Sequence, residues 1–190
     1  MISWLLNDNT ECSCVQETKT KVIYPLSLCK VKQHLRIDND FHDDDDYLET
    51  LIKVATTIAE NHIEKDIAKT LTELRIEDFS GDCMKIYDGN FLNVVSVSDN
   101  ELSAIGTIDK TTKKENYFKI EWTSNIDSDP LYINYYTGFN EDETPELIQH
   151  AILIKIADLY DSQRADVQWS GLTNQRVFES ILDTYRIIRF

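Results

Sequence analysis

Glycine and histidine are scarce in this sequence, and their placement limits the chemistry available to the chain. The five glycines are isolated from one another, at positions 81, 89, 106, 138 and 171. Neither a dinucleotide-binding loop nor a phosphate-binding P-loop can be built from them. The four histidines, at positions 34, 42, 62 and 150, do not pair with acids or cysteines at metal-ligand spacing. HExxH and GxSxG motifs are also absent. Nothing in these residues therefore indicates an activated nucleophile, and a catalytic site assembled from distant residues stays open as an alternative.

Long apolar runs are missing as well. The longest, Ala151 to Ile154, ends at Lys155, so no transmembrane span is expected. The first ten residues, MISWLLNDNT, lack a basic start and a small-residue cleavage site, which argues against a signal peptide. Without an export signal, the four cysteines are expected to be reduced thiols. Cys12 and Cys14 invite a zinc interpretation, but a second close pair is lacking.

Positive charge is the third shortage. Lysine and arginine together number 19 against 34 acids, which gives a formal net charge of −15 and a pI near 4.5. Such a chain repels phosphate, which argues against sequence-independent binding of nucleic acid through a basic face. The same charge argues against docking on an anionic membrane. With 42% hydrophobic and 10% aromatic residues over 190 positions, the chain is nevertheless predicted to fold around a real core.

Hydrophobic spacing predicts four helices, over residues 27–36, 43–65, 145–163 and 174–187. The third has the clearest start, because Thr144 suits an N-cap and Pro145 suits the first helical position. Its apolar residues form more than one stripe. The pattern therefore leaves two interpretations open: a central helix in a small core, or a helix with one side against a neighbouring subunit.

Between residues 70 and 136 the hydrophobic period changes from 3.6 to 2, which predicts strands. Asp88 and Gly89 predict a hairpin turn within residues 86–91, and the Lys-rich stretch 109–115 reads as a solvated loop. The predicted fold class is α+β: a mainly helical core of long antiparallel helices, with a small antiparallel β-sheet inserted between the second and third. The predicted domains are an N-terminal arm, 1–23, and one domain, 24–190, with helices in 27–65 and 145–190 and the β insertion in 70–136.

An acidic stretch precedes the second helix and invites a calcium interpretation. Asp38, Asp40 and Glu49 occupy positions one, three and twelve of an EF-hand loop. However, His42 stands at position five, and Asp43 stands at position six, where the tight turn needs glycine. The same acids also suit the first turn of a helix, where the dipole stabilises negative charge. We therefore expect no stoichiometric calcium or zinc.

The order of several short segments resembles a known family, the head–tail connector proteins of tailed phages. These are the gp6-like adaptors and especially the longer phiE125 gp8-like branch found in prophages and gene transfer agents. The resemblance spans about Tyr24 to Phe190, and its segments are PLSL at 25–28, VKQHLRI at 31–37, the helix 47–63, YTGF at 136–139, TPELI at 144–148, AIL at 151–153, LY at 159–160 and ILDTYR at 181–186.

This resemblance implies a structural role in the virion. Connectors of this family form a ring, usually twelve-fold, under the portal, and they receive a stopper or tail-completion protein. They extend a channel through which DNA passes without sequence-specific binding. Catalysis, cofactors and membranes are not expected. The implied location is the virion neck, with the host cytoplasm as the site of assembly.

Two sets of residues are candidates for contacts in such an assembly. The C-terminal segment is apolar at helical spacing and basic on an acidic chain. It is predicted to dock on the portal or an adjacent copy through Arg176, Phe178, Ile181, Leu182, Tyr185, Arg186, Arg189 and Phe190. The alternative is that this segment packs back on the core of its own chain. Asp43, Asp44, Asp45 and Asp46 are a candidate acidic face of the channel.

Two other classes of function remain as alternatives. One is an acidic interaction module, a DNA mimic or inhibitor that occupies a basic cleft on a partner protein, which the charge of −15 favours. The other is a calcium- or zinc-dependent enzyme, which the missing motifs disfavour.

Overall fold

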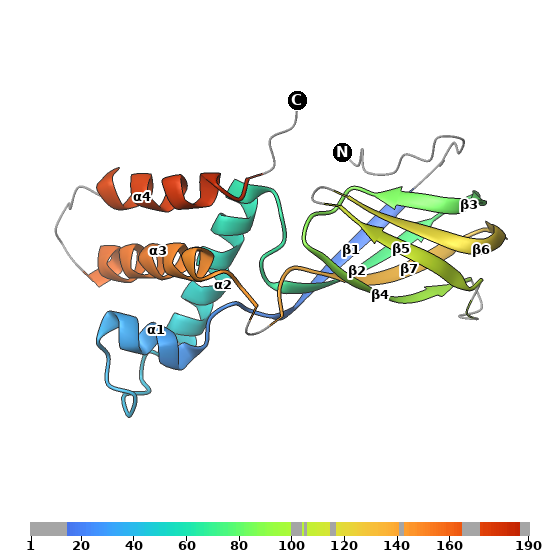
Figure 1. The fold of residues 1–190 in the computed structure, drawn as a ribbon. Helices are drawn as coiled ribbons and strands as arrows, with labels where there is room; N and C mark the ends of the chain where they lie inside the picture. The colour runs from blue at the N-terminus through green and yellow to red at the C-terminus, as the bar shows by residue number, and fades with distance from the viewer. Residues whose placement is uncertain are drawn as a thin grey trace. The chain divides into compact units, whose positions relative to one another are not determined.

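The computed structural model describes residues 15–99, 104, 106–114, 117–140, 143–164 and 172–186, and it divides into two compact units. The helical unit comprises residues 23–68 and 139–190, and the β unit comprises residues 1–22 and 69–138. The chain enters the helical unit after its first strand, leaves it for the β unit, and returns to it for the last two helices (Figure 1).

Four helices form the described part of the helical unit: α1 (Leu28–Leu35), α2 (Asp45–Ile63), α3 (Glu146–Arg164) and α4 (Leu172–Asp183). The side chain of Ser27 caps α1 by accepting from the amide of Lys30 at 3.4 Å. Arg36 and Glu64 end α1 and α2 in the left-handed conformation, with φ of 58° and 59°. No helix in the described ranges is long and apolar enough to cross a membrane.

Helix α3 lies at the centre of the helical unit. It contacts α1, α2 and α4, and α4 runs beside it (Figure 1). Its buried residues include Ile148, Ala151, Ile152 and Ile156, all in one core with side chains of the other three helices. Most of the apolar side chains of α3 are therefore covered within its own unit, whereas Leu147 is 54% exposed.

The end of α2 is joined to the following segment by a buried carboxylate. Glu60 is 8% exposed, and its Oε1 accepts from the backbone amides of Ile67 at 3.0 Å and Ala68 at 2.9 Å. The carbonyl of Ile67 in turn accepts from the amide of Phe139 at 3.1 Å. Both amides of this turn thus have partners, which a buried backbone requires.

The β unit contains two antiparallel sheets. One has the strand order β1-β2-β7-β4 and the other β3-β6-β5. The strands are β1 (Val15–Ile23), β2 (Lys69–Ile76), β3 (Phe79–Ile86), β4 (Phe91–Ser98), β5 (Ile108–Lys113), β6 (Phe118–Ser128) and β7 (Leu131–Thr137). Alternate residues of both sheets meet in one core, in which the rings of Phe91 and Phe118 stack at 3.9 Å and Phe118 meets Tyr135 edge-on at 5.0 Å.

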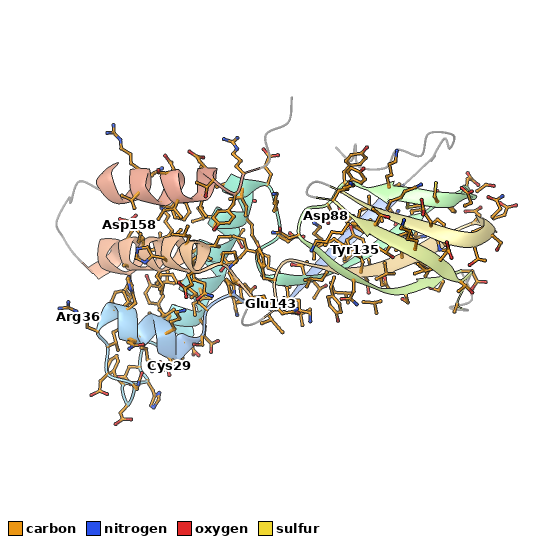
Figure 2. The ribbon with its side chains drawn as sticks, viewed as in Figure 1. Cys29, Arg36, Asp88, Tyr135, Glu143 and Asp158 are labelled. Atoms are coloured by element: carbon orange, nitrogen blue, oxygen red, sulfur yellow. The ribbon has the colours of Figure 1, made fainter. Side chains whose placement is uncertain are left out.

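The prediction of a hairpin at residues 86–91 is wrong. The flanking strands β3 and β4 belong to different sheets, so Asp88, Gly89 and Asn90 connect the two layers. Asp88 Oδ2 accepts from the hydroxyl of Tyr135 at 3.2 Å and from Lys19 Nζ at 3.1 Å (Figure 2). Burial is the main cause that raises the pKa of Tyr135, so its hydroxyl stays a donor at this junction.

The predicted fold class is also wrong. The described residues hold seven strands in two sheets with a core of their own, and two of the four helices are short, with 8 and 12 residues. Strand β1 lies in the segment assigned to an arm, and β5 lies in the stretch assigned to a loop. Both are edge strands with mostly exposed side chains, so neither carries the alternation by which strands are recognised.

Candidate functional site

The loop between α1 and α2 is built around a buried lysine. Lys32 is 3% exposed, although it lies on a helix at the surface of a small unit. Its ammonium donates to the carbonyl oxygens of Phe41 at 2.7 Å and Asn39 at 3.4 Å, and it pairs with Asp45 Oδ1 at 2.5 Å. A buried charge is tolerated only with such partners, and the loop backbone and Asp45 supply them.

Asp45 links this lysine to a histidine. Its second oxygen, Oδ2, lies 2.8 Å from His42 Nδ1. The hydrogen bond from Lys32, followed by that from His42, lowers the pKa of Asp45 below its ordinary value of 3.8. Asp45 is therefore ionised at neutral pH and holds the end of the loop against α1.

The four aspartates of the candidate channel face have two different environments. Asp44 accepts from the hydroxyl of Tyr160 at 2.9 Å and Asp45 holds Lys32, and both are half-buried. Asp43 and Asp46 are exposed. Two of the four thus stabilise the fold of the loop, and the channel role stays a prediction.

The same loop contains the residues that suggested an EF-hand. Asp38 Oδ1 accepts from the amide of Asp40 at 3.2 Å, as in a local turn. The cation in this loop is the ammonium of Lys32, which donates to two loop carbonyls and forms an ion pair with Asp45. Among the residues that the structure describes, no group of three or more His, Cys, Asp or Glu side chains could hold a metal ion.

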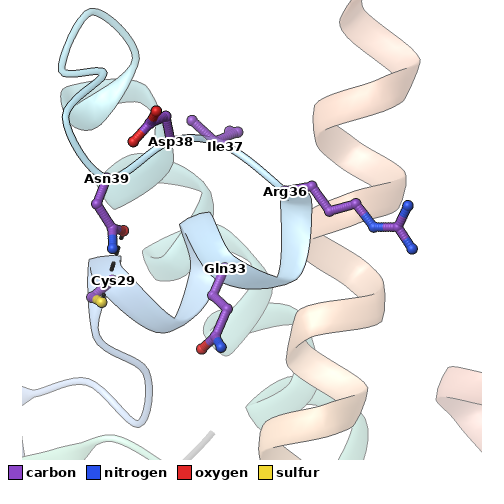
Figure 3. A pocket seen from close by; sticks show the side chains of 6 residues that line it. All are labelled: Cys29, Gln33, Arg36, Ile37, Asp38 and Asn39. Carbon is purple, nitrogen blue, oxygen red and sulfur yellow. Dashed lines mark hydrogen bonds between the residues drawn. The ribbon is translucent and has the colours of Figure 1, made fainter.

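A hollow of about 510 Å³ lies beside α1 and the first residues of the loop that follows it (Figure 3). It is lined by Cys29, Gln33, Arg36, Ile37, Asp38 and Asn39. The thiol of Cys29 lies 3.9 Å from the side-chain oxygen of Asn39. No histidine lines the hollow to act as a base for this thiol, so its lining does not make a nucleophilic site.

The C-terminal candidates fall into three groups. Phe178 and Leu182 are buried in the core of the helical unit, and Ile181 and Tyr185 pack against that core while half-buried. Arg176 and Arg186 are exposed. Arg189 and Phe190 lie outside the described residues.

Helix α4 is fastened to α2 by polar contacts at its end. His62 Nε2 lies 2.8 Å from Asp183 Oδ1, and Arg186 lies 4.0 Å from Glu64. Because Phe178 and Leu182 face inward, an interface made by α4 has the opposite side of the helix available, which includes Arg176 and Val177. That α4 docks on another subunit remains a prediction.

Sequence reasoning missed Lys32 and Phe41. A signal for the lysine was present, because Lys32 lies four residues after Leu28 and next to Val31, on the apolar side of α1. A lysine at such a position has to find internal partners. Phe41 carried no comparable signal, because it stands alone among polar residues.

Comparison with known proteins finds solved structures with the same fold. Three solved structures match over nearly the whole chain. One is the neck of an empty gene transfer agent particle computed with C6 symmetry, with a TM-score of 0.69, 15% identity, and coverage of 91% of this chain and 97% of that one. Another is the neck of the native particle computed with C12 symmetry, with a TM-score of 0.66, 13% identity, and coverage of 91% and 97%. The third is the virion of a native gene transfer agent particle, with a TM-score of 0.64, 15% identity, and coverage of 90% and 96%.

The fold is thus that of a chain found in the necks of phage-like particles. Residues 25–135 match the model of the phage gp6-like head-tail connector protein family, which is more than half of the chain. The chain belongs to this family. No curated protein matches the sequence.

Proposed function

We propose that this protein is a structural component of the virion neck and forms a ring between the portal and the tail or stopper. The observation that carries the proposal is the family match over residues 25–135. The likeness in fold to neck chains, over 91% of this chain, supports it. Neck reconstructions with C6 and C12 symmetry favour a ring. The proposed ring contains twelve copies of this chain.

The charge of the chain suits a channel through which DNA passes. A net charge of −15 repels phosphate, so DNA slides past such a surface without being held. The loop between α1 and α2 is the proposed acidic lining of the channel. Asp43 and Asp46 are its exposed candidate carboxylates, and they would face the DNA. A non-enzymatic role agrees with this proposal, because a ring component acts through its shape and its contacts.

The test is reconstitution on portal-containing heads that lack the neck. We expect the purified protein to join these heads in a number close to twelve, counted by native mass spectrometry of the extracted neck. Heads that lack the portal serve as the control and should bind no protein. Failure to join portal-containing heads, or equal binding to both, would contradict the proposed role.

The same preparation tests the alternative of an acidic interaction module. A DNA mimic competes with DNA for a basic cleft, whereas a neck ring does not. Titration of the protein into a complex of DNA with a basic DNA-binding protein should leave the DNA bound. Stoichiometric displacement of the DNA would favour the mimic instead.

A further inference from the structure

Phe41 is a large apolar side chain that is 41% exposed at the loop between α1 and α2. Its backbone is held on both sides. The amide of Phe41 donates to the carbonyl of Asp38 at 3.1 Å, and its own carbonyl accepts from the buried ammonium of Lys32 at 2.7 Å. The loop thus presents this ring to solvent while its backbone is bonded to the core of the unit.

Further contacts hold the rest of the loop. The amide of Ile37 donates to the carbonyl of Lys32 at 2.9 Å, and Tyr160 donates to Asp44 at 2.9 Å. The backbone around Phe41 is therefore ordered in the free protein. Binding through a preordered loop loses less conformational entropy than binding through one that has to fold on contact.

The exposed Asp, Glu, Lys and Arg side chains between Arg36 and Lys53 are all acidic, whereas the ammonium of Lys32 is buried beneath the loop. No lysine or arginine stands between Arg36 and Lys53, whereas the exposed acids nearby are Asp38, Asp40, Asp43 and Asp46. Arg36 points away from the loop in the close view (Figure 3). A surface that covers Phe41 therefore faces several carboxylates, and a basic surface is complementary to them.

We propose that Phe41 is an anchor that inserts into an apolar pocket rimmed by lysine or arginine on the portal. Copies of this chain adjoin one another in the proposed ring, but the anchor needs a basic rim, and a chain with 34 acids against 19 bases is not its complementary partner. Lys32 acts as a positioning residue through the Phe41 carbonyl. The proposal rests on the proposed function, since that role brings the portal into contact with this chain.

The test uses full-length Phe41→Ala on the neck-less, portal-containing heads described above. Val54→Ala is the matched control, because Val54 is also apolar, 41% exposed and in the helical unit. We expect Phe41→Ala to raise the concentration needed for half-maximal attachment by about thirtyfold, which is the fold-change of a 2 kcal/mol anchor. Val54→Ala should attach like the wild type, and both variants should keep the wild-type melting temperature.

Lys32→Met and the double variant test the positioning role. If Lys32 acts through Phe41, Lys32→Met should weaken attachment, and adding it to Phe41→Ala should cause little further loss. Attachment of the wild type should also weaken as NaCl rises from about 50 to about 500 mM. Salt screens the attraction between the aspartates around Phe41 and the basic rim of the pocket.

The outcomes separate this inference from the proposed function. Attachment of Phe41→Ala at the wild-type concentration would overturn the anchor, as would equal losses in both alanine variants. Normal attachment of Phe41→Ala with impaired DNA passage would place the loop in the channel and would also overturn the anchor. If the wild type itself does not join portal-containing heads, the proposed function fails and the anchor fails with it.

Discussion

At the scale of single residues, a few buried polar groups set the shape of the helical unit. Lys32 and Glu60 are 3% and 8% exposed, and each bonds backbone groups of a segment that has no regular structure. One orders the loop before α2, and the other orders the turn after it. Each of these two side chains supplies hydrogen bonds to backbone groups that a helix or sheet would satisfy elsewhere.

The carboxylate of Asp45 is expected to make the stability of the fold depend on pH. Its pKa is lowered in the folded state by Lys32 and then by His42, so it stabilises the fold at a pH above the unfolded value, near 3.8. This contribution is lost as the pH falls below that value through the folded pKa. We expect Asp45→Asn to be less stable than the wild type at pH 6, with the difference shrinking as the pH falls below the unfolded value near 3.8.

Unfolding in urea is monitored by circular dichroism at a series of pH values, and the midpoint urea concentration is compared between variants. Asp46→Asn is the control, because Asp46 is adjacent and exposed and likewise lies in the first turn of α2. It should follow the wild-type curve closely. A pH profile for Asp45→Asn that runs parallel to the wild type would contradict the assignment.

At the scale of elements, α4 has two sides with different roles. Phe178 and Leu182 lie in the core with residues of α2 and α3, whereas Val177 is 44% exposed. Lys155 of α3 lies above the ring of Phe178 at 5.8 Å. The inner side of α4 therefore stabilises the helical unit, and the outer side is free to take part in assembly contacts.

Substitution on the two sides should separate these roles. Phe178→Ala is expected to lower the free energy of unfolding by about 3–5 kcal/mol, because it removes a buried ring and leaves a cavity. Val177→Ala should change the free energy by about 0.5 kcal/mol or less, because its side chain is largely solvated. Urea unfolding followed at 222 nm measures both. Similar losses in the two variants would mean that α4 is not packed with Phe178 inward.

At the scale of the whole molecule, net charge is the dominant property. Acids outnumber bases by 34 to 19. Most ion pairs in the described residues lie near the surface, where each contributes little, so long-range repulsion among the excess acids is expected to decide how the chain responds to salt.

We therefore expect the melting temperature to rise as NaCl increases from about 20 to about 200 mM at pH 7, because screening reduces repulsion within the folded chain. Differential scanning fluorimetry checks this. Sucrose at equal osmolality controls for effects that do not depend on ionic strength. A falling melting temperature would show instead that local pairs such as Lys32 with Asp45 outweigh the repulsion.

Local signals in the sequence were sufficient to place the helices. Ser27 before α1, and Thr144 with Pro145 before α3, indicated where these helices begin to within a residue or two. The change of hydrophobic period at residue 70 likewise separated the strand region from the helices, since β2 begins at Lys69. These features depend on residues close together in the chain, so they can be recognised without the fold.

Strand pairing, by contrast, was decided only by the tertiary structure. A turn at Asp88 and Gly89 is compatible with a next strand in the same sheet or in the opposite sheet. Strand β4 joins the opposite sheet, where Phe91 is buried against Phe118 between the two layers. Edge strands β1 and β5 have mostly exposed side chains and are recognisable only by their neighbours. Lys32 is internal because Phe41, Asn39 and Asp45 close over it, and these residues lie seven to thirteen positions away. The common reason is that partners distant in the chain determine each outcome, while periodicity reports only on neighbours.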